Sequence, residues 1–112
     1  MTKKPRQNRL DQYSTFIDLI PAEEIQQVFD HWVSTFPTNK GKQPILSKPR
    51  TAHIAWALHT FGLDLCLQAI DGCAKSEWHM GGNPGEKIYN EITLIFRDIP
   101  HTKRFIQINR NT

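Results

Sequence analysis

The sequence predicts a small all-α domain, and three features of its pattern support this prediction. Apolar residues recur at intervals of three and four along several segments, which is the period of an amphipathic helix. Proline or glycine stands where these segments begin and end. The one β-prone stretch, ITLIF, lies inside a helical stripe, so we predict no strands. A chain of 112 residues holds one core. We therefore expect a single-domain bundle of about four main helices, with a structured glycine-rich loop before the last long helix.

The ends of the chain are expected to lie outside this bundle. Residues 1–12 have no apolar periodicity and are rich in basic residues, which predicts a flexible basic arm. The helical domain should span residues 13–106, and residues 107–112 should form a frayed tail. Residues 13–20 mix apolar and polar side chains, and they fit either a short helix or an extended lead-in.

The first long helix is predicted from Pro21 to about Phe36. Proline fits the first turn of a helix, and two acids follow it where the helix dipole favours them. Trp32 lies within the apolar stripe and is assigned to the core, whereas His31 falls off the stripe and is expected to be exposed. The stripe consists of Ile25, Val28, Phe29, Trp32, Val33 and Phe36.

A loop over residues 37–47 separates this helix from a closely spaced helical pair. Ser47 is a suitable N-cap for a helix that runs to about Phe61, and Gly62 is a suitable residue to end it. A third helix should follow over residues 63–73. It places Cys66 and Cys73 on one face but about 10 Å apart, beyond the roughly 7 Å that a disulfide spans. We interpret both as reduced core thiols, which are typical of a reducing cytoplasm.

The glycine-rich loop is the strongest candidate for specific recognition. Trp78, His79 and Met80 directly precede its glycines, so these large side chains are expected to fix the loop in place. The last long helix should start near residues 84–86 and continue to Asp98, and Pro100 should end it. Residues 101–106 would then form a final short turn. The stripe of this helix consists of Ile88, Tyr89, Ile92, Ile95, Phe96 and Ile99.

The distribution of charge points to a polyanionic partner. The formal net charge is only +3, but 11 of the 14 basic residues lie in three clusters that contain no acid. The alternative is a solvated surface that serves solubility alone. The clusters are Lys3, Lys4, Arg6 and Arg9; Lys40, Lys42, Lys48 and Arg50; and Lys103, Arg104 and Arg110.

An aromatic side chain beside basic residues is how proteins hold single-stranded nucleic acid. Trp78 and His79 are therefore predicted to contact bases, although Trp78 could equally fill the space beneath the loop. Lys48 and Arg50 lie in the first turn of a predicted helix, where the dipole disfavours cations by up to about 1 kcal/mol. This placement indicates an external anion. The predicted phosphate contacts are Lys40, Lys42, Lys48, Arg50, Lys75 and Lys87.

Several other kinds of site find no support in the sequence. The CxxC and HxxxH spacings of structural metal sites are missing. A nucleophilic cysteine needs a neighbouring histidine to activate it, whereas both cysteines here fall on a predicted buried face. No glycine-rich nucleotide motif follows a strand. No apolar run approaches the roughly 20 residues that span a membrane, and no signal peptide is evident. We expect a cytoplasmic protein with no enzymatic activity, cofactor or metal.

Motifs spread over residues 25–105 resemble the C-terminal module of phage and prophage replication-type proteins. The most specific of them is the pairing of HMG-x-N with a later RD. The layout is also loosely similar to the DnaD/DnaT-type modules of primosome proteins, which are helical and associated with single-stranded DNA. Such modules usually follow an N-terminal winged-helix or other domain, whereas a short basic arm precedes this one. The matching positions are Trp32, Arg50, Ile54, Leu58, Gly62, residues 69–72, Ser76, residues 78–81, Asn83, Tyr89, residues 94–98, His101 and Phe105.

The resemblance and the charge distribution together imply a non-enzymatic phage or mobile-element protein, which would act in the cytoplasm of a bacterial host. It would bind nucleic acid during replication, with single-stranded DNA preferred. The alternative is a phage-encoded inhibitor or adaptor that binds a host or defence protein complex, as anti-CRISPR proteins do. Both would act without a membrane.

Overall fold

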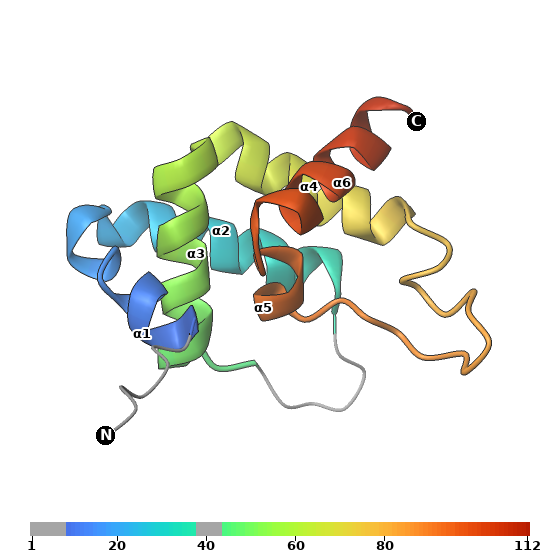
Figure 1. Cartoon of the computed structure of the whole chain (residues 1–112), viewed down its shortest axis with the longest axis horizontal. Coiled ribbons are helices and arrows are strands. Elements are labelled where there is room, and N and C mark those ends of the chain that lie inside the picture. Colours follow the sequence, from blue (N-terminus) through green and yellow to red (C-terminus); the bar gives the residue numbers. More distant parts are fainter. Residues whose placement is uncertain (1–8, 38–43) are drawn as a thin grey trace, which may run out of the picture.

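The computed structural model describes residues 9–37 and 44–112, and it confirms the all-α prediction (Figure 1). Within these residues the structure contains helices and one isolated β-bridge, between Met80 and Ile88, but no strand. The elements are α1 (Arg9–Ser14), a 3-10 turn η1 (Ile17–Leu19), α2 (Ala22–Thr35), α3 (Lys48–Phe61), α4 (Leu63–Lys75), α5 (Ile92–Ile95) and α6 (Ile99–Arg110).

The central element is α3, which four other helices contact. Seven consecutive residues of α3, from Ala52 to Leu58, are buried, because α1, α2, α4 and α5 all contact this helix. Its boundaries are those predicted: the Ser47 side chain caps the first turn by accepting from the Arg50 backbone N–H, and Gly62 ends it with φ at +87°. The prediction for α2 is also confirmed, with Trp32 buried in its apolar stripe.

The closest helix packing is between α4 and α6. Gly72 lies directly against the backbone of Phe105, and a Cβ atom on Gly72 would stand 1.7 Å from the Phe105 carbonyl oxygen. Glycine is therefore required at this crossing. In Figure 1, α6 lies across α4 near the C-terminus.

The prediction of a long helix from residues 84–86 to Asp98 is wrong. Residues 86–91 run as a non-helical segment, α5 is a single turn, and the last long helix is α6. Pro100 starts this helix and does not end it, because proline also fits a first turn, where its missing N–H costs no hydrogen bond. The Asp98 carboxylate caps the new start by accepting from the His101 N–H at 2.9 Å. Consequently α6 includes residues 107–110, which were expected to be frayed.

The N-terminal segment packs onto α3 through Tyr13. Its ring stacks on Trp56 with 4.4 Å between centroids, and its hydroxyl donates to the Arg97 carbonyl at 2.9 Å. Helix α1 begins at Arg9, so the last four residues of the predicted arm, 9–12, are helical. The rest of that arm, together with Lys40 and Lys42, lies outside the described residues.

Across the described ranges, none of the helices has the length and apolar character needed to cross a membrane.

Candidate nucleic-acid interface

The loop between α4 and α5 projects from the body of the domain (Figure 1), and its own hydrogen bonds tie it together. The Asn83 side chain holds the two arms of the loop. Its Nδ2 donates to the carbonyls of Trp78 at 2.8 Å and Lys87 at 2.7 Å, and its Oδ1 accepts from the N–H groups of Gly85 and Lys87. Further along the arms, the Tyr89 N–H donates to the His79 carbonyl at 2.7 Å. The loop is therefore held in place as expected, but by the Asn83 side chain and backbone bonds, whereas Trp78, one of the large side chains expected to fix it, is half exposed.

This scaffold presents two stacked aromatic rings to solvent. The rings of Trp78 and Tyr89 are nearly parallel, 16° apart, with 5.3 Å between their centroids. Trp78 is 52% exposed and Tyr89 37%. Trp78 is therefore not buried beneath the loop, and part of its ring surface is exposed to solvent.

A pocket of about 350 Å³ adjoins Trp78 on the side facing α6. Its lining combines loop residues with two side chains of α6 and consists of Ser76, Trp78, His79, Arg104 and Ile108. Arg104 is exposed and makes no hydrogen bond or ion pair within the described residues, so its guanidinium is free to meet an anion.

His79 stands at this pocket as a neutral ring near pH 7. The Ser76 Oγ lies 2.6 Å from His79 Nδ1 and also accepts from the His79 N–H at 3.3 Å. A hydroxyl carries one proton and two lone pairs, so the Ser76 Oγ can either donate to Nδ1 or accept from it while it accepts from the His79 N–H. Burial lowers the pKa of His79, and the nearby charge of Arg104 lowers it further.

The predicted phosphate contacts at the loop are both at the surface. Lys87 is exposed and its ammonium makes no hydrogen bond within the described residues. Lys75 is also exposed, but its Nζ donates to Asn109 Oδ1 at 2.8 Å. Lys48 is exposed at the first turn of α3, with no partner in the described part of the chain.

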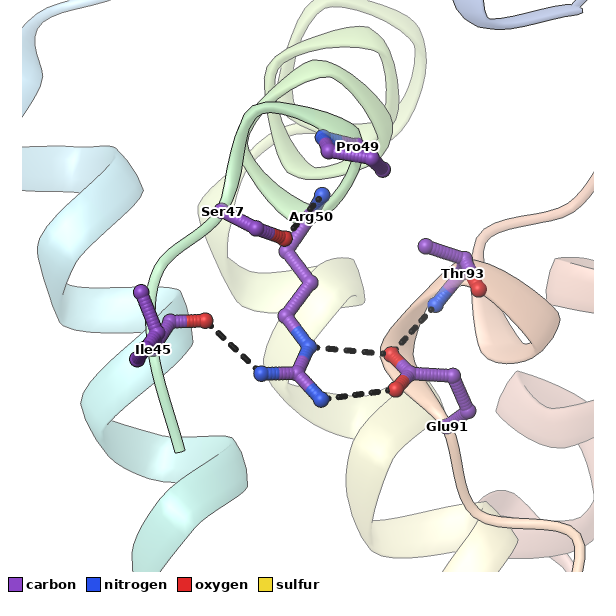
Figure 2. Close-up of a pocket in the computed structure, with 6 residues that line it drawn as sticks. All are labelled: Ile45, Ser47, Pro49, Arg50, Glu91 and Thr93. Carbon is purple, nitrogen blue, oxygen red and sulfur yellow. Dashed lines mark hydrogen bonds and ion pairs between the residues drawn. The ribbon is translucent and has the colours of Figure 1, made fainter. Parts of the chain in front are cut away.

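Arg50 occupies a different environment from the one the sequence suggested. Its Nη2 donates to Glu91 Oε1 at 2.8 Å and its Nε donates to Glu91 Oε2 at 3.3 Å (Figure 2). Its Nη1 donates to the Ile45 carbonyl at 2.7 Å. The guanidinium also lies 4.9 Å from the centre of the Trp32 ring. The sequence predicted an external anion near the start of α3. For Arg50 that prediction is wrong, because Glu91 of the same chain is the anion.

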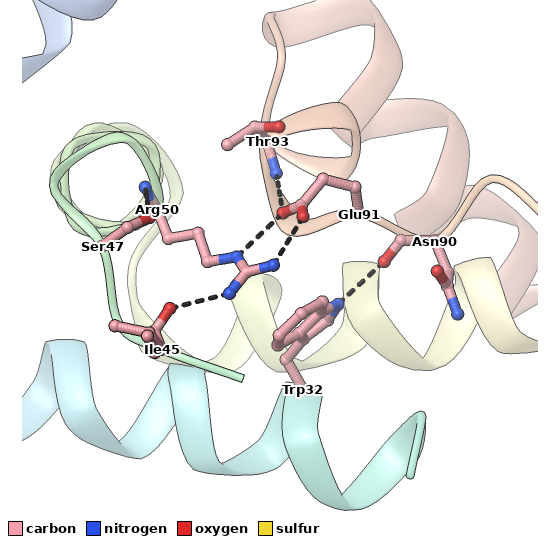
Figure 3. Close-up of polar contacts among 7 residues, drawn as sticks. All are labelled: Trp32, Ile45, Ser47, Arg50, Asn90, Glu91 and Thr93. Atoms are coloured by element: carbon pink, nitrogen blue, oxygen red, sulfur yellow. Dashed lines mark hydrogen bonds and ion pairs between the residues drawn. The ribbon is translucent and has the colours of Figure 1, made fainter. Parts of the chain in front are cut away.

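The Arg50–Glu91 pair also fixes the end of the loop between α4 and α5. Glu91 caps α5 by accepting from the Thr93 N–H at 3.2 Å, and the Trp32 indole N–H donates to the Asn90 carbonyl at 2.8 Å (Figure 3). Burial opposes ionisation of Glu91, but the hydrogen bonds from Arg50 and Thr93 outweigh it and lower the pKa of the carboxyl. This group of contacts joins α2, α3 and α5 through Asn90 and Glu91, the two residues that follow Tyr89 in the chain.

Sequence reasoning missed two residues of the interface. Tyr89 was assigned to a helical stripe, and Arg104 was noted only as part of a basic cluster. Asn83 is expected from the sequence to fix the loop, because an asparagine among glycines often closes a turn through its own side chain, and its hydrogen bonds agree with this. A closed loop would have brought Tyr89 back towards Trp78.

Two further expectations can be compared with the structure. His31 is not a free surface residue, since its Nε2 lies 2.7 Å from Asp71 Oδ1. Cys66 and Cys73 are free and buried as predicted, and burial raises the pKa of each thiol to about 12. Among the described residues, no group of three or more His, Cys, Asp and Glu side chains is arranged to hold a metal ion.

Comparisons with protein-family models, with curated proteins and with solved structures found no match to this chain.

Proposed function

We propose that this protein binds single-stranded nucleic acid through the loop between α4 and α5, with single-stranded DNA in phage or mobile-element replication as the setting. The observation that carries the proposal is the half-exposed Trp78 stacked on Tyr89 beside unpaired basic side chains. The sequence resemblance to replication-type modules supports the setting. The binding requires no catalysis, cofactor or metal.

A stacked aromatic pair favours single strands because the faces of bases in a duplex are already covered by their neighbours. Each base stacked on an aromatic side chain contributes roughly 1–3 kcal/mol. The loop is fixed by Asn83 and by the bond between Tyr89 and His79, so Trp78 loses little conformational freedom when a base binds. The neutral imidazole of His79 adds a ring that can form a hydrogen bond at the pocket next to that base.

Basic side chains around the loop would neutralise the backbone phosphates. Arg104 lines the pocket beside Trp78, Lys87 lies on the loop, and Lys75 stands at the end of α4. Three phosphate contacts to a single strand predict that log K falls with log salt at a slope of about −2. Arg50 is not among them, because its guanidinium is bound to Glu91.

Fluorescence anisotropy with labelled 12-mer single strands and the matching duplex tests the proposal over a salt series starting near 50 mM. We expect tighter binding of the single strand, and a loss of about 5- to 150-fold in Trp78→Ala, equivalent to one stacked base. Ile88→Ala is the matched control, because Ile88 is 58% exposed on the same loop. Absence of binding at low salt, or equal affinity of wild type and Trp78→Ala, would reject the proposal.

The second candidate is a protein-binding inhibitor or adaptor, and the exposure of Ile88 favours it. Successive side chains of an extended segment point to opposite faces, so Ile88 and Tyr89 present different surfaces. An exposed branched aliphatic residue suits a protein partner better than a nucleobase. This candidate predicts co-purification with a host complex that is lost in Ile88→Ser, together with no affinity for oligonucleotides.

A further inference from the structure

A second pocket lies on the other flank of α6, away from the aromatic loop. It has a volume of about 270 Å³ and is enclosed by the end of α3, the start of α4 and one face of α6. Its floor is apolar and its rim is polar or basic. The floor consists of Phe61, Leu65 and Ile106, and the rim of Lys103, Gln107 and Arg110.

The helical repeat separates this pocket from the candidate nucleic-acid site. Lys103, Gln107 and Arg110 are spaced four and three residues apart and therefore share one face of α6. Arg104 and Ile108, which line the pocket beside Trp78, are each turned from Lys103 and Gln107 by about 100°. A ligand can therefore occupy either pocket while the other remains free.

The two charged side chains that line this pocket, Lys103 and Arg110, are both cations. No acidic side chain lines it, and the whole of α6 contains none. Lys103 is exposed and has no partner among the described residues, and Arg110 makes only a 3.4 Å contact from Nε to Gln68 Oε1. Both cations are available to carboxylates at the pocket mouth.

We propose that this pocket docks an acidic segment of a partner protein, with one large apolar side chain inserted between Phe61, Leu65 and Ile106. Flanking carboxylates of that segment would pair with Lys103 and Arg110. A nucleic-acid backbone fits less well, because phosphates would satisfy the rim but leave the apolar floor in contact with water. The chain's own segments 1–8 and 38–43 do not fit either, since they carry basic residues and no acid.

Titration of the ¹⁵N-labelled full chain with capped pentapeptides, followed by NMR, tests this inference. The probe is DEFDE, and the controls are DESDE, which lacks the apolar side chain, and KKFKK, which reverses the charge. We expect DEFDE to shift the amide signals of Leu65 and Gln107 while those of Trp78 and Tyr89 stay in place. Each control peptide should bind about tenfold more weakly or not at all.

Protein variants give the second arm of the test. The double variant Lys103→Glu/Arg110→Glu should bind DEFDE about tenfold more weakly, because two exposed ion pairs are lost. Lys48→Glu replaces an exposed cation at the start of α3, outside the pocket, and should bind as wild type does. Unchanged NMR signals from the buried core confirm that both variants are folded.

Three results would overturn the inference. The first is equal binding of DEFDE and either control peptide, or no loss of binding in the double variant. The second is displacement of the peptide by the single-stranded 12-mer, which would assign the pocket to nucleic acid. The third is self-association that sedimentation detects in the wild type and that Lys103→Glu/Arg110→Glu abolishes. The occupant of the pocket would then be a second copy of this chain, which could insert Leu19, a residue that is 64% exposed beside the exposed Asp18.

Discussion

The variant Arg50→Met tests whether this cation stabilises the folded protein or contacts phosphate. Methionine keeps most of the length and apolar character of the stem but removes the guanidinium. The variant loses the two bonds to Glu91, the bond to the Ile45 carbonyl and the contact with the Trp32 ring. Glu91 keeps the Thr93 N–H as a donor, so the cap of α5 survives.

The cost of Arg50→Met follows from the exposure of the pair. Hydrogen bonds to charged groups contribute about 1.5–3 kcal/mol each when water is excluded. The Glu91 side chain is 43% exposed, so water replaces much of what the carboxylate loses. We therefore expect the free energy of unfolding to fall by about 2 kcal/mol in total, which lowers Tm by about 8 °C for a domain of this size.

The assay compares thermal unfolding with DNA binding in the same variant. The salt slope of single-strand binding should stay unchanged in Arg50→Met, because the lost guanidinium is bound within the chain. Lys48→Met is the matched control and should unfold within about 0.5 kcal/mol of wild type. An unchanged Tm combined with a salt slope reduced by about 0.7 would refute the reasoning and return Arg50 to the phosphate contacts.

Three further predictions concern the core. Gly72→Ala should destabilise the protein by about 3 kcal/mol or more in urea unfolding, because the new methyl group would stand 1.7 Å from the Phe105 carbonyl oxygen. Gly85→Ala is the control, because the Cβ added there meets nothing closer than 3.7 Å. Burial lowers the pKa of His53 from its ordinary value of 6.5, so as the pH falls this histidine is protonated in the unfolded chain before it is protonated in the folded protein. The free energy of unfolding should therefore fall as pH drops below about 6.5, and it should fall less steeply in His53→Gln than in the wild type. Cys66 and Cys73 should resist a thiol reagent at pH 8 until the protein is unfolded, because burial raises both pKa values to about 12.

Local sequence signals located most of the helices because they depend on neighbouring residues alone. The apolar stripe of α2, the Ser47 cap of α3 and the glycine that ends it at Gly62 all match the structure. The last helix was misplaced because Pro100 carries two opposite meanings: it can stop a helix or occupy its first turn. Asp98, as a cap two residues earlier, was the signal for the second meaning.

The candidate site depends on contacts between distant residues, which local patterns do not contain. Tyr89 is not helical because its N–H donates to the His79 carbonyl across the loop, and the Trp32 indole N–H donates to the carbonyl of the next residue, Asn90. Glu91 lies 41 positions from Arg50, so no spacing rule pairs them. Trp78 and His79 could be found from the sequence because large side chains beside glycines are unusual, whereas Arg104 enters the site only through the position of α6.

The stacking of a base on Trp78 is the central claim, and two conservative substitutions test it most directly. Trp78→Phe keeps an aromatic face, while Trp78→Leu keeps a large apolar side chain without one. With single-stranded DNA at low salt, we predict that Trp78→Phe binds within a few fold of wild type and that Trp78→Leu loses about tenfold or more. Equal affinities of the Phe and Leu variants would show that Trp78 contributes apolar bulk alone, and would contradict the account of this loop as a surface for stacked bases.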